Sequence, residues 1–251
     1  MTRHDERDLR NLKTNQGIIS YHLIRSQKRR TVAIHIDQQA QVRVLAPRFV
    51  DEDKITAFIS EKTGWVWRTI HKMRRKRILS VRHEFTAGEE FLFLGKNYPL
   101  RIDMNGCGEI KLLFDGAQWH AVVPTLLAAE KRYKGIKEAM IQWYRQQAME
   151  ILGGRVFNYS RLMGLEPLKI TVKTQKTLWG SCHHQRKSIH LNWKIIMAPM
   201  AVIDYVVVHE LSHLKVPNHS LRFWREVEKV LPDYKVRKRW LKDNTYKMNF
   251  E

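Results

Sequence analysis

The segment that most constrains this chain is His209-Glu210-Leu211-Ser212-His213, which is followed by His219. Residues four apart share one face of an α-helix, so His209 and His213 can direct their imidazoles at one point. Glu210 is rotated by about 100° from His209, so its carboxylate should lie beside that point. This spacing is typical of a zinc site with a carboxylate base. It predicts metal ligands at His209 and His213 and a general base at Glu210.

A third ligand is expected shortly after this helix. Pro217 and Asn218 should end the helix and let the chain turn, which brings His219 back towards the metal. Glu226 and Glu228 are alternatives, because other zincins take a glutamate from the following helix. Three protein ligands leave the fourth position open for water, and we expect one Zn²⁺ per chain.

The residues before the motif support a metal site. Residues 202–208 are apolar nearly all round, as in a buried helix. A histidine and a glutamate at the end of such a helix need polar partners, and a metal with its water would supply them. Asp204 could orient a ligand histidine, or it could equally face solvent.

Composition indicates a soluble globular protein with 43% apolar residues in 251. The first ten residues are charged and no apolar run approaches the roughly 18 residues of a membrane span, which predicts a cytoplasmic protein without membrane contact. Cys107 and Cys182 show no Cys-x-x-Cys spacing, so neither a disulfide framework nor a cysteine zinc site is indicated. Cys182 with His183 and His184 could form a second metal site or a regulatory thiol; a loop packed under the active site explains it more simply.

The charge is strongly positive: 45 Lys and Arg residues face 25 Asp and Glu residues, which gives +20 and a pI near 10.1. A charge of this size attracts polyanions, so nucleic acid or a phosphate-rich substrate is a candidate partner. Solvated basic faces explain the charge equally well. The basic residues are spread over several clusters, at 28–30, 71–77, 131–134, 186–187 and 235–239.

The chain is expected to contain two parts after a frayed tail at residues 1–16. Residues 17–124 form a β-rich amino-terminal module with one helix, and residues 125–251 form a zincin-like catalytic domain. The module should begin with a three-stranded meander, followed by a helix from Asp51 to about Arg77. A second β-rich section occupies residues 85–123, in which Asp115-Gly116 is a good hairpin turn.

The catalytic part should begin with a long helix at 125–163. Strands at 168–173 and 188–192 flank a loop at 177–182, and three helices follow at 199–216, 220–230 and 233–242. Since strands precede the metal-binding helix, a sheet edge could hold an extended substrate. The backbone of Gly180 and Ser181 or the Asn192 amide could contact substrate or stabilise an oxyanion. Trp179 and Trp224 are expected to be packing residues.

Several of these segments together resemble the YgjP-like metallopeptidase family, which is related to the WLM and SprT-type zinc proteases. The resemblance rests on Trp179–Cys182, Leu191–Trp193, Tyr205–Leu214 and Asn218–Trp224, and it extends over about residues 17–243. It implies an α+β fold, with a β-rich amino-terminal module packed on a gluzincin-like domain that contains a small sheet and the His-Glu-x-x-His helix. It also implies zinc ligands at His209, His213 and His219 and general acid-base chemistry at Glu210.

The sequence leaves three functions open. The first is a zinc metallopeptidase acting on polypeptides. The second is a zinc-dependent nucleoside triphosphate pyrophosphatase, because the resemblance also implies activity on nucleotide phosphoanhydrides and the charge suits such a substrate. The third is a DNA-associated protease whose basic surface binds nucleic acid.

Overall fold

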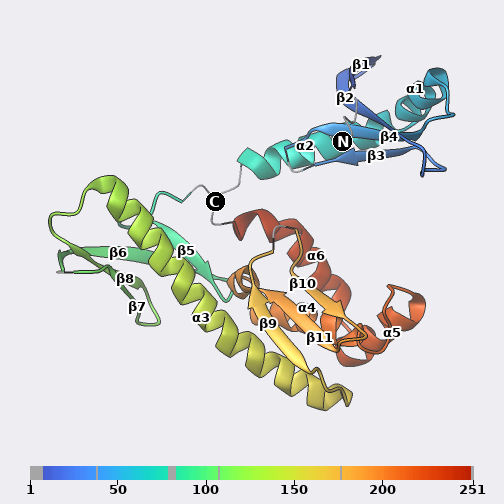
Figure 1. Cartoon of the computed structure of the whole chain (residues 1–251). Coiled ribbons are helices and arrows are strands. Elements are labelled where there is room, and N and C mark those ends of the chain that lie inside the picture. Colours follow the sequence, from blue (N-terminus) through green and yellow to red (C-terminus); the bar gives the residue numbers. More distant parts are fainter. Residues whose placement is uncertain (1–7, 38, 79–82, 107, 176, 250–251) are drawn as a thin grey trace, which may run out of the picture. The chain divides into compact units, whose positions relative to one another are not determined.

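The computed structural model describes residues 8–37, 39–78, 83–106, 108–175 and 177–249. The chain forms two compact units, residues 1–80 and 81–251 (Figure 1). This division falls earlier than the boundary expected near residue 125. The reason is that the strands of residues 90–124 share one hydrophobic core with the helices of residues 129–244.

The first unit is a four-stranded sheet followed by two helices. The strand order is β1-β2-β4-β3, with β2 and β4 parallel and the other pairs antiparallel. The prediction of a three-stranded meander is wrong, because β2 and β4 are parallel and so are not joined by a hairpin. The prediction of a single helix is also wrong, because two helices follow the sheet. The elements are β1 (Asp8–Thr14), β2 (Gly17–Ser26), β3 (Ala33–Ile36), β4 (Val42–Pro47), α1 (Glu52–Glu61) and α2 (Thr63–Ile78).

Local chemistry accounts for these differences. Residues 8–14 were expected to be frayed, but they form an edge strand because the chain reverses tightly into β2, where Gly17 adopts a φ of +127°. The helix breaks at Lys62, whose N–H donates to the carbonyl oxygens of both Phe58 and Ile59. One face of the sheet then packs on the two helices, through Ile19, Tyr21, Leu23, Val42, Val44, Ile55, Ile59, Val66 and Ile70.

The second unit begins with a sheet of the same design. Its strands are β5 (Glu90–Phe93), β6 (Lys96–Gly106), β7 (Lys111–Phe114) and β8 (Trp119–Pro124), in the order β5-β6-β8-β7. The central pair β6 and β8 is again parallel. A helix, α3 (Ala129–Met163), follows β8 just as α1 follows β4, and each helix begins five residues after a proline, Pro47 or Pro124. The chain thus contains a repeated ββββα motif.

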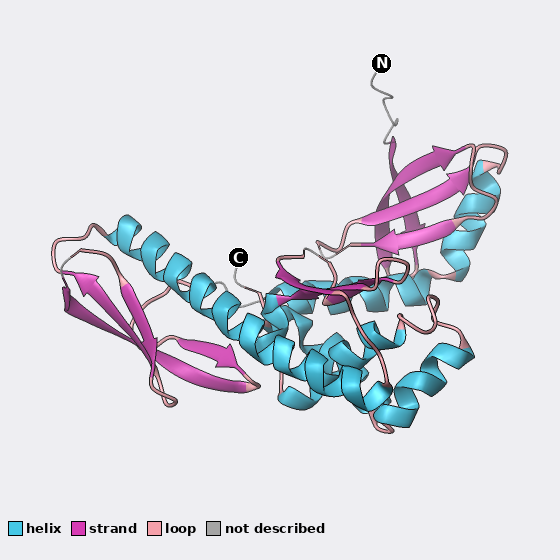
Figure 2. Ribbon diagram, turned by 60° about the horizontal axis from the view of Figure 1, so that its bottom comes forward, coloured by secondary structure: helices cyan, strands magenta, loops and turns pink. Residues whose placement is uncertain are grey.

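The remaining elements form the rest of the second unit. Figure 2 shows α3 running from the first sheet of this unit towards a second, three-stranded sheet with the order β10-β11-β9. The expected α+β class is confirmed. The elements are β9 (Lys169–Lys173), β10 (Gly180–His183), β11 (Ser188–Asn192), the 3₁₀ helix η1 (Trp193–Met197), α4 (Met200–Ser212), α5 (Leu221–Val230), α6 (Tyr234–Asn244) and η2 (Thr245–Lys247).

Helix α3 is long but polar on one side. Its buried residues recur every four positions, and it continues without interruption through Gly153 and Gly154, where a bend had been considered. None of the helices in the described ranges carries an apolar stretch long enough to cross a membrane.

The first sheet of the second unit is fixed to the segment that leads into α4. The turn between β5 and β6 donates two main-chain hydrogen bonds to η1, from Leu94 to Ile196 (2.9 Å) and from Gly95 to Met197 (3.0 Å). Both turn residues have positive φ, and Gly95 touches Pro199 so closely that an added Cβ would lie 2.7 Å from its Cγ. This turn therefore helps to set where α4 begins.

We predict that Gly95→Ala destabilises the protein more than Gly116→Ala. Both glycines have positive φ, so both variants carry the same backbone penalty, but the space around Gly116 is open. The collision with Pro199 should cost Gly95→Ala roughly 1–3 kcal/mol more. Urea denaturation measures the difference. Equal urea midpoints for the two variants would show that the contact of the turn with Pro199 does not help to position α4.

Candidate metal centre

Helix α4 is buried almost all round, as expected from residues 202–208. His209 and Glu210 lie in its last turn, and His213 is the first residue after it. The helix ends earlier than the expected residue 216. It closes with a turn in which the Val216 N–H donates to the Ser212 carbonyl oxygen at 3.0 Å. The chain then reverses before α5, so His219 returns to the end of α4.

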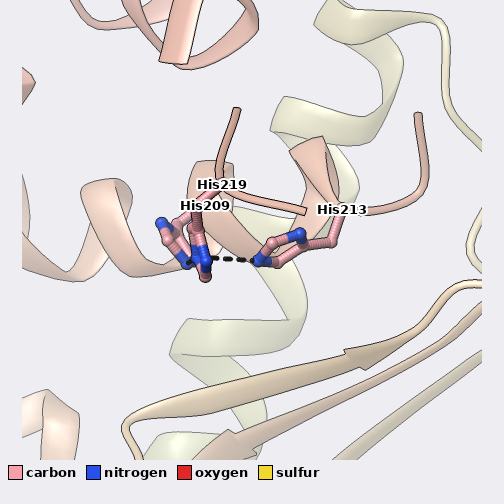
Figure 3. Close-up of side chains that lie close together, drawn as sticks. All are labelled: His209, His213 and His219. Carbon is pink, nitrogen blue, oxygen red and sulfur yellow. Dashed lines mark hydrogen bonds between the residues drawn. The ribbon is translucent and has the colours of Figure 1, made fainter. Parts of the chain in front are cut away.

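The three expected ligand histidines lie together, as Figure 3 shows. The Nε2 atom of His219 lies 3.0 Å from that of His209 and 3.2 Å from that of His213. The three ligand atoms are all within 4.8 Å of one another, and this is the one such group of three metal-binding side chains among the described residues. One imidazole thus comes from the last turn of α4, the second from the residue directly after it, and the third from the loop before α5.

These nitrogens fit a metal ion better than they fit protons. The Nδ1 atom of His213 lies 3.1 Å from the Val216 carbonyl oxygen, which can only accept, so Nδ1 carries the proton and Nε2 presents a lone pair. An imidazole nitrogen carries either a proton or a lone pair, so protons cannot bridge three converging nitrogens well. Ligands on a tetrahedral zinc lie about 3.3 Å apart, close to the observed separations.

The electrostatics favour neutral imidazoles, which are the form that binds metals. Burial, together with the nearby His213, His219 and Lys238, lowers the pKa of His209 to about 3. Burial likewise lowers the pKa of His213. His209 and His213 therefore supply lone pairs without competition from bound protons at neutral pH.

Aromatic rings from α5 line the site. Phe223 stacks on His213, with ring centroids 4.4 Å apart, and Trp224 stacks on His219 at 5.7 Å. Trp224 was expected to be a packing residue, and in the structure it packs directly against His219, one of the expected ligands. Trp179, the other tryptophan in that expectation, is partly buried against the core.

Glu210 lies against the backbone of strand β10. Its side chain is buried, and burial raises the pKa of its carboxyl group to about 8. A Cβ added at Gly180 would lie 2.6 Å from Cγ of Glu210 and 2.7 Å from its Oε1. The missing side chain at Gly180 therefore makes room for this carboxylate. Sequence reasoning had assigned Gly180 to substrate contact and had not identified this role.

Strand β10 lies at the edge of its sheet, in a segment that was expected to be a loop. The main-chain N–H of Asn192 donates to the Trp179 carbonyl oxygen at 2.9 Å. In an antiparallel pair, hydrogen-bonded residue pairs alternate with pairs that are not hydrogen-bonded, so the main chains of Ser181 and His190 also form a hydrogen-bonded pair. The main-chain groups of Gly180 and Cys182 then point away from β11 to the free edge. The backbones of Gly180 and Ser181 were both expected to contact substrate. The main-chain groups of Gly180 face the free edge, whereas those of Ser181 bond to β11.

The Asn192 side chain was expected to contact substrate or stabilise an oxyanion, but in the structure its hydrogen bonds are internal. Its amide donates to the carbonyl oxygens of Gln175 (2.9 Å) and Leu178 (3.0 Å), and its Oδ1 accepts from the Lys194 N–H. It is buried and ties the loop before β10 to η1. Since its donors are used internally, the amide does not serve as an oxyanion donor. The Ser181 hydroxyl likewise lies 3.3 Å from Gln175.

The structure also resolves the alternatives for Asp204 and the two glutamates. Asp204 accepts hydrogen bonds from Arg155 at 2.6 and 2.9 Å, so it neither orients a histidine nor lies free in solvent. Glu226 accepts from Lys229 at 2.6 Å, and Glu228 lies 4.0 Å from Lys235. Neither glutamate belongs to the metal-binding group of the described residues.

Cys182 does not form a second metal site with its neighbours in the described chain. Burial, together with the nearby Glu210, raises the pKa of its thiol to about 11, which disfavours a thiolate. His184 bonds through Nδ1 to the His213 carbonyl oxygen at 3.1 Å, so it supports the end of α4. Cys107 lies outside the described residues.

Comparison with known proteins found a family model and solved structures that this chain is similar to. Residues 30–244 match the model of the YgjP-like family, described as a metallopeptidase domain. The crystal structure of the zymogen of Pyrococcus abyssi abylysin is 24% identical, with a TM-score of 0.35, and covers 39% of this chain and 99% of its own. That of Methanocaldococcus jannaschii jannalysin is 22% identical, with a TM-score of 0.33, and covers 36% and 91%. The search of curated proteins gave no match.

The fold and the histidine group thus define a metallopeptidase-like protein, and a family of metallopeptidase domains implies a divalent metal. The match covers most of the chain. The protein belongs to the YgjP-like family.

We predict that the purified protein binds one zinc ion, and that His219→Ala loses it while Glu226→Ala keeps it. The reason is that His219 Nε2 closes the group of three nitrogens, whereas Glu226 is engaged with lysines. Metal analysis after dialysis against a weak chelator measures the content. Zinc that survives in His219→Ala and is lost from Glu226→Ala would assign the third ligand to the glutamate.

Proposed function

We propose that the protein is a zinc-dependent metallopeptidase in which Glu210 is the general base. The observation that carries this proposal is the placement of Glu210, a buried carboxylate that follows His209 in α4 and packs against Gly180 of the edge strand β10. The group of three histidines lies at the same end of α4. His209, His213 and His219 would hold one Zn²⁺. When bound, zinc polarises a carbonyl group and makes water acidic enough to lose a proton near neutral pH.

Glu210 would take the proton from the attacking water and pass it to the leaving amine. Its burial favours this role, because a desolvated carboxylate binds a proton more strongly than an exposed one. Its fixed place on the Gly180 backbone limits how far it can turn away from the metal. Phe223 and Trp224 shield the imidazoles on the α5 side.

Strand β10 would orient the substrate. The main-chain groups of Gly180 and Cys182 at the free edge can pair with an extended peptide, which adds a strand to the sheet. Glu210 lies against the same strand, so a paired peptide would pass beside the base. The Gly180 N–H at this edge is also a candidate donor to the developing oxyanion.

We predict that Glu210→Gln retains zinc and fold but lowers peptide hydrolysis at least about a hundredfold, because the amide cannot accept the proton. Glu226→Gln is the matched control and should remain active, since Glu226 bonds to lysines outside the histidine group. Casein-derived peptides with mass-spectrometric detection provide the assay. Full activity of Glu210→Gln would refute the proposed mechanism.

A nucleoside triphosphate is the second candidate substrate, and Lys238 favours it. Its ammonium lies 4.0 Å from the centre of the Trp224 ring, and that ring is 5.8 Å from the ring of His209. The two distances together place the ammonium within about 10 Å of this ligand. Lys238 forms no ion pair with a described residue. It therefore offers a cation near the histidine group that no carboxylate of the described residues neutralises, and a phosphate could lie there.

We predict that, if nucleotides are hydrolysed, Lys238→Ala raises their KM about tenfold or more. Arg239→Ala, which removes the same charge from the next position of α6, should leave KM within about twofold. A tenfold weakening corresponds to about 1.4 kcal/mol, within the range of one charge-assisted hydrogen bond. Release of pyrophosphate from the four nucleoside triphosphates, converted to phosphate by an added inorganic pyrophosphatase, measures this. Equal effects of the two variants would remove Lys238 from substrate binding.

A further inference from the structure

The first unit contains a groove that the proposed hydrolysis does not use. A hollow of about 510 Å³ lies between the β1–β2 turn and helix α2, and a second of about 420 Å³ adjoins it. Both are lined by Gln16 and Gly64, so they form one continuous depression, which we call the α2 groove. The side chains used below are those of Lys13, Asn15, Gln16, Trp67, Arg68 and His71.

The repeated ββββα motif indicates that this corner is a place where another chain can bind. In the second unit, the turn between the first two strands and the following helix α3 both contact the segment Trp193–Met197. Leu94 and Gly95 bond to its main chain, and Tyr144 packs on Trp193 with ring centroids 5.9 Å apart. In the first unit the corresponding turn, between β1 and β2, and helix α2, which continues the chain after α1 ends at the break at Lys62, border the open groove.

The charge of the groove selects an anionic occupant. None of the residues that line the two hollows carries a carboxylate. Lys13 and Arg68 are exposed and form no ion pair with a described residue. The surrounding unit is also basic, because residues 1–80 contain 18 of the 45 Lys and Arg residues but only 8 of the 25 Asp and Glu residues.

The aromatic rings in the groove indicate that the anion carries flat rings. The Trp67 ring is fixed, because its Nε1 donates to the Thr14 hydroxyl at 3.3 Å and its edge packs against Gly17. His71, one helical turn further along, is exposed and lies 5.7 Å from the Trp67 ring. Rings held beside cations are the usual platform on which unpaired nucleobases stack.

We propose that the α2 groove binds single-stranded nucleic acid. Lys13 and Arg68 contact the phosphates, His71 and Trp67 stack on bases, and the Asn15 and Gln16 amides reach base edges. A duplex is a poorer occupant, because its bases are already stacked on each other and do not enter a hollow of this size. An acidic polypeptide would satisfy the cations but would leave the two rings without partners.

The test is the affinity of the full-length protein for a fluorescent oligonucleotide of about 12 nucleotides, measured by anisotropy at several salt concentrations. Wild type should bind with a steep salt dependence. Lys13→Ala/Arg68→Ala should bind at least about tenfold more weakly with a smaller salt slope, since two phosphate contacts are lost. His71→Ala should bind more weakly with an unchanged slope, because stacking releases no counterions.

Two controls make the outcome decisive. Lys111→Ala/Arg186→Ala removes the same charge from exposed positions of the second unit and should change affinity less than about twofold. Glu210→Gln should bind as wild type does, so the result is independent of the proposed hydrolysis. The proposal is overturned if wild type does not bind, if the control pair loses as much affinity as the groove pair, or if duplex DNA or polyglutamate competes equally well.

Discussion

The convergence of three imidazole nitrogens at the end of a buried helix is the constraint on which the second unit depends. Without a metal this arrangement would be unfavourable, because buried nitrogen lone pairs would face one another without enough hydrogen-bond donors. A divalent cation removes that cost by accepting all three lone pairs. The early end of α4 at Ser212 and the reversal of the chain before α5 are the local features that allow His219 to join the pair on the helix.

The rest of the second unit holds α4 near both of its ends. At the start of the helix, the β5–β6 turn bonds to η1 and touches Pro199. Near the end of the helix, Gly180 lets strand β10 approach Glu210 closely. Glu210, the proposed base, is therefore positioned by contact with the backbone of β10, the strand whose free edge we propose as the substrate-binding edge. Binding and proton transfer would depend on the same close approach.

The sequence predicted the centre of this site better than its surroundings. The spacing of His209, Glu210 and His213 is local, because a helix alone brings these residues together, and the turn before His219 was signalled by Pro217. The parallel pairings of β2 with β4 and β6 with β8 depend on long-range contacts that periodicity does not encode. The short strand β10 contains two polar residues and a glycine, so no strand pattern marked it. Asn192 was assigned by residue type alone, which could not show that its amide was already bonded within the loop.

The most direct test of the central claim is X-ray absorption spectroscopy at the zinc edge of the purified protein. Three imidazole nitrogens and one oxygen of a water molecule are predicted, at about 2.0–2.1 Å from the metal. The imidazole scattering should fall by about one third in His219→Ala if metal is retained there at high zinc concentration. A sulfur ligand at about 2.3 Å, which would implicate Cys182, or only two imidazoles in the wild type, would contradict the account.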